Sequence, residues 1–324
     1  MSDAGTGLSG QFSALAGRLA SGDRACTLSV MASRFDVPYL ELTIAHLVRA
    51  CNYPFAERLL NMDVGCGAAN RAYSGAATIA ELLASAQRLC DRGVIDRIVT
   101  FDDKLCQNEA LSRKHFGRRL RWSRDCRGVP LWGWINEFEA CQTEYLVHFD
   151  CDMLLHQAPG HSWIADGMDL LKRRPDVMFA LPLPGPPTAD GRLFQKKDEN
   201  YVRDDDGFFR FRSFTSRKFL VDRRRFEQLL PLRPLYISWK RRLWQHVTRK
   251  NALRNWETMV SRRLQSSPYV RADLASPNAW TLHSHDHGPE FQRLLPAIIE
   301  RVESGFAPPE QAGFYDLKLK YWMS

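Results

Sequence analysis

Apolar and amphipathic stretches alternate along the first half of the chain. Short apolar runs that end in polar residues predict strands, and leucines at helical spacing predict helices. The expected strands are 26–34, 57–65, 95–103 and 145–149, and the expected helices are 38–51, 77–93 and 133–142. Strands that alternate with helices are typical of a parallel sheet built from crossover units, so this half predicts an α/β fold.

The second half of the chain is less regular. We expect a helix at 163–176, a strand interrupted by prolines at 177–187, a polar loop at 190–207, one or two strands at 209–222, and helices at 223–230, near Glu257 and at 290–305. We find no internal repeat and no low-complexity linker in the sequence. The simplest organisation is one continuous domain over 25–300, between a flexible N-terminal segment at 1–24 and a C-terminal tail at 301–324.

The composition is that of a chain able to bury a large core. The 324 residues are 44% apolar and 25% charged, which excludes disorder of the whole chain. The first residues lack the apolar run of a signal peptide, and no run of about 18 apolar residues follows, so we expect a cytoplasmic protein. Eight cysteines lie between Cys26 and Cys151 without a CxxC pair, which predicts reduced thiols.

The net charge of +8 is concentrated in one segment. Residues 233–263 carry nine basic residues and one acid, Glu257, so the rest of the chain is neutral. Within 235–254, Trp239 and Leu243 stand at helical spacing among the cations, which is typical of a helix that contacts an anionic membrane surface. An ordinary surface helix packed on the core, or a site for a diphosphate or an acidic ligand, are the alternatives. No nucleic-acid-binding module is recognisable, so we expect no nucleic-acid partner.

Two carboxylates follow the apolar run 145–149 directly. Asp150 and Asp152 are separated by one residue, and ligands of open parallel sheets bind beyond the carboxyl ends of the strands. There both carboxylates can reach one divalent cation, and Mg²⁺ and Mn²⁺ prefer such oxygen ligands and share them with phosphates. The alternative is that the two aspartates only cap the turn that follows.

Three histidines form a second polar cluster near the end of the chain. His283, His285 and His287 alternate with other residues, so in an extended chain all three side chains project to one side. Imidazole is a ligand for zinc and for metals of the Mn²⁺ class. We select His283 first and His285 second as metal ligands. The alternative is a solvated loop in which one histidine is hydrogen-bonded.

The stretch EYLVHFDCDM, preceded by GVPLWGWINEFEACQT, resembles the DxD region of nucleotide-sugar glycosyltransferases of the GT-A fold, most closely glycosyltransferase family 2. The resemblance extends to LSVMASR, to Asp63 and to WETMVSRRL, and covers roughly residues 25–290. It implies a Rossmann-like, mostly parallel sheet flanked by helices, with an irregular C-terminal region on the acceptor side.

The resemblance also implies roles for individual residues. Ser33 and Arg34 would line the nucleotide pocket, and Asp63 would approach the base or ribose. Asn136 belongs to the helix that leads into the DxD strand and counts among the nucleotide-binding residues. Asp150 would face the ribose or the metal.

The same resemblance implies the residues of catalysis. Asp152 would bind the Mn²⁺ or Mg²⁺ that bridges the donor diphosphate, and some enzymes of this fold complete the metal site with a C-terminal histidine. Glu257 would be the general base that faces the acceptor hydroxyl. The cations around Glu257 would weaken it as a base, so a structural ion-pair partner is the alternative, and Asp205 or Asp206 would be the next candidates.

The expected function is therefore metal-dependent transfer of a sugar from a nucleotide-diphosphate sugar to an unknown glycan, lipid or protein acceptor. A phosphotransfer enzyme of the haloacid dehalogenase type is the first rival, because HFDCDML also resembles its strand-end motif. That family expects the motif near the start of the domain and a small pair after it, where this chain has Met153 and Leu154. A non-catalytic nucleotide-binding protein of the same fold is the second rival.

Overall fold

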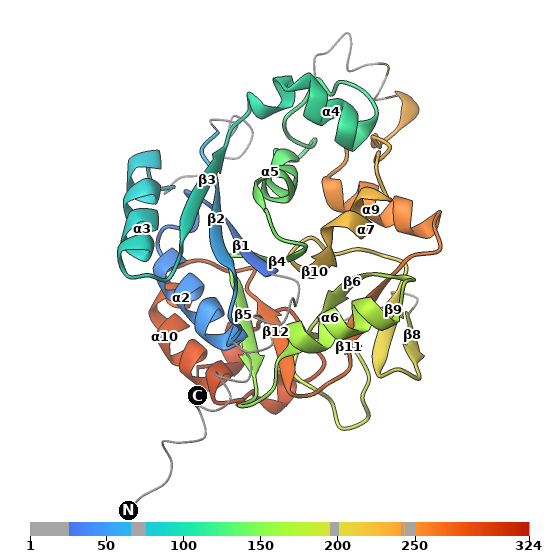
Figure 1. The fold of residues 1–324 in the computed structure, drawn as a ribbon. Coiled ribbons are helices and arrows are strands. Elements are labelled where there is room, and N and C mark those ends of the chain that lie inside the picture. Colours follow the sequence, from blue (N-terminus) through green and yellow to red (C-terminus); the bar gives the residue numbers. More distant parts are fainter. Residues whose placement is uncertain (1–25, 66–75, 195–200, 241–242, 244–250, 324) are drawn as a thin grey trace, which may run out of the picture.

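The computed structural model describes residues 26–65, 76–194, 201–240, 243 and 251–323 (Figure 1). The N-terminal segment 1–24 lies outside the described residues, as do residues 241–242 and 244–250 of the basic segment 235–254. Among the described helices, none combines the length and the apolar composition needed to cross a membrane.

A nine-stranded sheet in the order β3-β2-β1-β4-β10-β6-β11-β9-β8 forms the centre of the structure. Its first part is built from β1 (Cys26–Ser33), β2 (Glu57–Asp63), β3 (Arg97–Phe101) and β4 (Tyr145–Asp150). These four strands are parallel, with β1 between β2 and β4. The predicted α/β fold with a mostly parallel sheet is confirmed.

The second part of the sheet has five strands, of which β9 and β10 run in the opposite direction to β4. It is built from β6 (Val177–Leu181), β8 (Tyr201–Asp204), β9 (Phe208–Phe211), β10 (Lys218–Asp222) and β11 (Val270–Leu274). β10 pairs antiparallel with both β4 and β6, and β9 pairs antiparallel with both β11 and β8. The loop expected at 190–207 is therefore partly wrong, because Tyr201 packs on Phe209 and Phe211 and fixes β8 as an edge strand.

The helices cover both faces of the sheet and bury two apolar clusters. They are α2 (Leu40–Cys51), α3 (Ile79–Asp91), α4 (Glu109–Phe116), α5 (Trp132–Ala140), α6 (Trp163–Arg173), α7 (Arg223–Glu227), α9 (Trp256–Gln265) and α10 (Pro289–Glu303). Successive side chains of β4 alternate between the clusters. Tyr145, Val147 and Phe149 pack with α2, α3, α6 and α10, whereas Leu146 packs with α4, α5, α7 and α9.

A second, three-stranded sheet adjoins the carboxyl end of β4. It consists of β5 (Met153–Gln157), β12 (Ala279–His283) and β7 (Leu183–Pro184), with α2 and α10 packed against β5 (Figure 1). The DCD sequence is therefore the turn between two strands that belong to different sheets. Because β12 pairs antiparallel with β5, His283 lies opposite Met153, next to that turn.

The residues expected as a C-terminal tail belong to the domain. They include the short 3₁₀ turns Pro309–Gln311 and Leu319–Tyr321, and the apolar side chains of Tyr315, Leu317 and Trp322 are buried in the core. The backbone of this segment bonds to β12, since His283 N–H donates to Tyr315 O and Leu317 N–H donates to His283 O. The predicted boundary at 300 was too early because the apolar side chains beyond it were not recognised as core.

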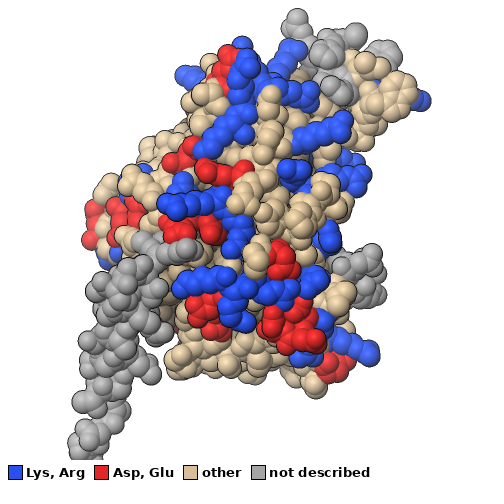
Figure 2. Space-filling model, turned by 45° about the vertical axis from the view of Figure 1, so that its right-hand side comes forward, with Lys and Arg blue, Asp and Glu red and all other residues tan. Residues whose placement is uncertain are grey.

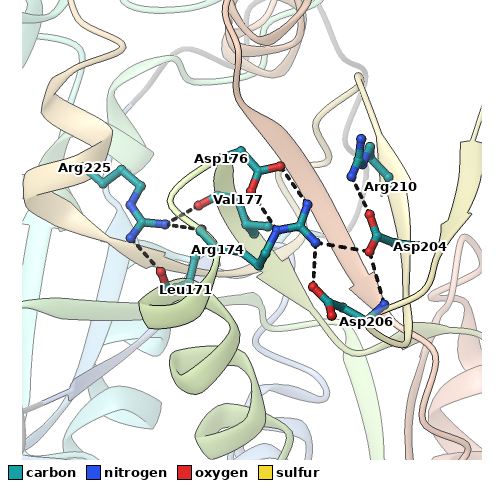
Figure 3. Close-up of polar contacts among 8 residues, drawn as sticks. All are labelled: Leu171, Arg174, Asp176, Val177, Asp204, Asp206, Arg210 and Arg225. Carbon is teal, nitrogen blue, oxygen red and sulfur yellow. Dashed lines mark hydrogen bonds and ion pairs between the residues drawn. The ribbon is translucent and has the colours of Figure 1, made fainter.

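Arg174, just after α6, fastens the β8–β9 hairpin to the rest of the domain (Figure 3). Its guanidinium donates to Asp176 at 2.9 Å, to Asp204 at 3.1 Å and to Asp206 at 2.6 Å. Arg210 adds a second cation on Asp204. Asp206, named above as an alternative base, is thus engaged in holding the hairpin.

Candidate active and metal-binding site

The DCD turn is held rigidly by the backbone on both sides. Cys151 N–H donates to Met31 O of β1 at 3.0 Å, and Asp150 N–H donates to Arg217 O, just before β10, at 2.8 Å. The Cys151 side chain is buried. The turn therefore presents Asp150 and Asp152 in fixed positions at the carboxyl ends of β1 and β4.

A cavity of about 230 Å³ lies beyond the carboxyl ends of β1, β2 and β4. Five of the predicted site residues line it: Ser33, Arg34, Asp63, Asp150 and Asp152. This is the position that the sheet topology predicts for a ligand.

Asn136 does not line the cavity, although it was expected among the nucleotide-binding residues. Its side-chain amide donates to Asn61 Oδ1 of β2 at 2.9 Å, and the Asn61 amide donates to Gly133 O. The residue of α5 that reaches the cavity is Trp134, two positions earlier. Asn136 therefore fastens α5 to the sheet.

Arg124 is a cavity residue that the sequence analysis missed. Its guanidinium donates to both carboxylate oxygens of Asp63 at 3.0 Å and to Asp103 Oδ1 at 2.7 Å. Burial alone would lower the pKa of Arg124, but the two carboxylates raise it. Asp63 therefore reaches the cavity as half of a bidentate ion pair, and not as an isolated carboxylate.

Asp36 is a second missed residue, and it shapes the turn after β1. Its carboxylate accepts hydrogen bonds from Ser33 N–H at 2.6 Å, from the Ser33 hydroxyl at 2.9 Å and from the Tyr39 hydroxyl at 2.6 Å. Burial raises the pKa of Asp36. The local signal was an acid three residues after a serine at a strand end, a spacing that favours side-chain to backbone bonds.

Behind Asp150 lies a buried chain of polar groups. His148 Nε2 lies 3.3 Å from Asp150 Oδ1, and His148 Nδ1 lies 2.8 Å from Glu137 Oε2, which also accepts from the Ser29 hydroxyl. Burial alone would lower the pKa of His148, but the two carboxylates raise it to about 9. Burial raises the pKa of Asp150 to about 6, against the effect of His148. A cationic imidazole therefore orients Asp150 from behind.

Asp152 faces two of the three clustered histidines. His283 Nε2 lies 3.2 Å and His287 Nε2 3.5 Å from Asp152 Oδ2. Burial would raise the pKa of Asp152, but the histidines hold it below its ordinary value. Burial lowers the pKa of His283, so its imidazole is neutral, as metal ligation requires.

The donor atoms around Asp152 suit a divalent cation. Asp152 Oδ1 and His287 Nε2 are buried, and neither makes a hydrogen bond with the described residues. Buried polar atoms normally have partners, and a cation bound by carboxylate and imidazole would supply one here. Asp152, His283 and Asp150 therefore fit the predicted metal, with His287 as a fourth donor.

His285 points elsewhere. Its Nε2 lies 3.0 Å from Asp316 Oδ1, and the ligand atoms of His283, His285 and Asp316 all lie within 4.8 Å of one another. The two histidines selected as metal ligands therefore lie together, with Asp316 as the carboxylate beside His285. β12 ends at His283, so the alternation of an extended chain ends there, and His287 rather than His285 lies near Asp152.

Glu257 lines a different cavity of about 370 Å³, together with Arg217, His285 and Asp316. It sits in the first turn of α9, and its Oε2 accepts from Ser216 N–H at 2.9 Å and from the Ser216 hydroxyl at 3.0 Å. Among the described residues, no Lys or Arg forms an ion pair with Glu257, although Arg217 and Arg271 line the same cavity. Asp205 and Asp206 line neither of these two cavities.

No protein-family model matches the chain, and no curated protein sequence matches it. Among solved structures, it is similar to the galactosyltransferase LgtC with donor and acceptor sugar analogs, at 12% identity and a TM-score of 0.35, over 74% of this chain and 69% of that one. It is also similar to glucosyl-3-phosphoglycerate synthase from Mycobacterium tuberculosis with Mg²⁺ and UDP, at 12% identity and a TM-score of 0.36, over 90% and 80% of the two chains. UDP-glucose pyrophosphorylase with UDP-glucose matches at 7% identity and a TM-score of 0.39, over 77% and 90%. A likeness of this size assigns no residue, and we derive the roles from the site itself.

Proposed function

We propose that the chain is a glycosyltransferase of the GT-A type that uses Mn²⁺ or Mg²⁺ and a nucleotide-diphosphate sugar. The observation that carries the proposal is the meeting of the DCD turn with His283 beside a cavity at the carboxyl ends of the parallel strands. Carboxylate and imidazole donors at such an edge are suited to a cation that is shared with phosphates.

Asp150, Asp152, His283 and His287 would hold the cation. When bound, it supplies charge neutralisation for the diphosphate that departs from the sugar. Asp150 enters the set already oriented by His148, and Asp152 enters it ionised because the histidines lower its pKa. These residues of the chain therefore define one position for the diphosphate next to the turn.

The donor nucleoside would occupy the first cavity. The Arg124–Asp63 pair offers both a donor and an acceptor edge to a base or ribose, and Asp36 fixes the turn that carries Ser33 and Arg34. Arg217 is a suitable cation for the diphosphate because its side chain reaches His283 and pairs with no carboxylate among the described residues.

The acceptor would enter through the second cavity, where Glu257 is the proposed general base. Ser216 anchors Glu257 Oε2, while Oε1 accepts no hydrogen bond from the described residues and can take a proton. The acceptor oxygen then bonds to the anomeric carbon, the bond from that carbon to the diphosphate breaks, and the acceptor proton passes to Glu257. Arg217 lies between the two cavities, since it lines the second and contacts His283 beside the first.

Nucleotide binding with and without metal tests the proposal. Calorimetry with UDP, GDP and ADP should show binding that needs Mn²⁺, because Asp150 and Asp152 repel a diphosphate until a cation neutralises them. Asp152→Asn should abolish that binding, and Asp205→Asn, a change of an exposed aspartate in the β8–β9 turn, should leave it intact. Metal-independent binding that survives alanine at both 150 and 152 would overturn the metal assignment.

The leaving group distinguishes sugar transfer from the rival activities. Incubation with a nucleotide sugar should release the nucleoside diphosphate, slowly to water and faster once an acceptor is present. Release of inorganic phosphate would instead indicate a phosphotransfer enzyme. Tight, metal-dependent binding without any turnover of nucleotide sugars would indicate a non-catalytic binding protein.

A further inference from the structure

A second basic segment lies beside the one that the sequence analysis singled out. Residues 117–128 contain five arginines and a single acid, Asp125. Four of these arginines, Arg118, Arg119, Arg121 and Arg127, are exposed. The segment contacts the chain around 231–253, since Arg118 donates to the Tyr236 hydroxyl at 3.4 Å and Cys126 N–H donates to Leu253 O at 2.8 Å. Two stretches more than 100 residues apart therefore form one surface.

Most exposed cations of this surface have no carboxylate partner. Five exposed basic residues pair with no carboxylate among the described residues, whereas Arg127 pairs with Asp125; the five are Arg118, Arg119, Arg121, Arg233 and Lys240. On other faces, exposed arginines such as Arg49 and Arg88 pair with glutamates. Figure 2 shows the consequence, because Lys and Arg gather with few acids over the upper part of the molecule, where Figure 1 places α4. We call these five residues the basic face.

Apolar side chains protrude beside the basic face. Trp239 is 69% and Leu243 60% exposed, so Trp239 does not pack on the core as an ordinary surface helix would require. A groove of about 530 Å³ runs beside Trp239 and is lined by Phe116, Pro231 and Leu235, with Arg118 and Arg233 on it. A polyanion without bases, such as heparin, would use the cations alone, whereas a lipid surface uses cations and protruding aromatic or aliphatic side chains together.

We propose that the basic face, with Trp239, docks on an anionic lipid bilayer. The cations meet the anionic headgroups, and Trp239 and Leu243 enter the interface between headgroups and acyl chains. Arg124 and Arg127 belong to the same segment and line the first cavity, so a docked chain holds that cavity close to the bilayer. The proposal is independent of the reaction, because binding to lipid needs neither metal nor nucleotide.

Co-sedimentation with vesicles tests the proposal without any substrate. The protein should bind vesicles that contain phosphatidylglycerol, bind pure phosphatidylcholine vesicles far more weakly, and dissociate as salt is added. R118Q/R119Q/R121Q should lower the partition coefficient about 100-fold, because each basic residue near such a surface contributes about fivefold. The control R92Q/K172Q/R293Q removes the same charge from the residue after α3, from α6 and from α10, and should change binding less than about twofold.

Trp239→Ser separates a bilayer from other anionic partners. It should weaken vesicle binding while leaving the salt dependence unchanged, since it removes an interfacial side chain and no charge. Circular dichroism should show that the basic-face triple variant, the control triple variant and Trp239→Ser are all folded, because every changed side chain is exposed. Three outcomes would overturn the proposal. They are no vesicle binding, equal losses in the basic-face and control variants, and a Trp239→Ser variant that binds vesicles as tightly as the parent protein.

Discussion

The three clustered histidines offer a graded test of the candidate metal site. His283 Nε2 lies 3.2 Å from Asp152 Oδ2 and its side chain is buried, whereas His287 Nε2 lies 3.5 Å away and its side chain is 33% exposed. His285 contacts Asp316 instead, at 3.0 Å. Single replacement by glutamine, which keeps a polar side chain but removes the imidazole, should therefore lower metal affinity in the order His283, His287, His285.

The expected magnitudes follow from the role of each side chain. Loss of a group that only orients a metal ligand costs about 10–100-fold in affinity, so loss of the His283 ligand should cost about 100-fold or more. His287→Gln should cost about 10-fold, as a more exposed and more distant donor, and His285→Gln less than about twofold. Titration with Mn²⁺ alone, followed by electron paramagnetic resonance of the free ion, measures all three affinities without nucleotide or acceptor.

Two results would refute this reasoning. If His285→Gln loses more Mn²⁺ affinity than His287→Gln, the metal belongs to the cluster of His283, His285 and Asp316. If all three variants bind Mn²⁺ like the parent protein, the histidines do not ligate it. Urea unfolding of each variant controls for loss of the fold, which matters most for the buried His283.

Further predictions concern the base, the nucleoside pocket and acid stability. Glu257→Gln should lower kcat for sugar transfer about 10²–10⁴-fold with donor affinity unchanged, and unchanged turnover would exclude this carboxylate as the base. Arg124→Lys keeps the charge but loses the paired hydrogen bonds to Asp63, so the free energy of unfolding in urea should fall by about 2 kcal/mol. Nucleotide affinity should fall as well, and an unaffected affinity would place the nucleoside elsewhere. Burial lowers the pKa of His46, whose Nε2 accepts a hydrogen bond from Leu155 N–H. The unfolded chain therefore binds more protons, so stability should fall as pH drops below about 6.5, and His46→Gln should lessen that loss; the same pH dependence in the variant would contradict it.

The sequence predicted the first half of the sheet because β1, β2 and β4 are mostly buried and read as apolar runs. The prediction of parallel strands also placed Asp150 and Asp152 at a ligand-binding edge, since the carboxyl ends of parallel strands share one edge of the sheet. Ser33, Arg34 and Asp63 were selected through the family resemblance, and all of them line the first cavity.

The residues that escaped prediction depend on contacts between distant segments. Arg124 lies in an irregular stretch, and its partners Asp63 and Asp103 come from the ends of two other strands. The choice between His285 and His287 depends on where β12 ends, which the sequence pattern does not mark. Asp316 lies in the stretch expected as a tail, and only its packing on β12 brings it to His285.

The small sheet gives the candidate site an order of assembly during synthesis of the chain. Asp150 and Asp152 leave the ribosome with β4, when the parallel core can already begin to fold. The imidazoles arrive with His283 at the end of β12 and with the residues just after it, and the backbone of residues 315–317 then bonds to His283. The acidic half of the site therefore exists on the nascent chain well before its imidazole half. A cation held by both halves, as proposed above, would therefore bind only after the last residues have docked, and its binding would report that this part of the chain has folded.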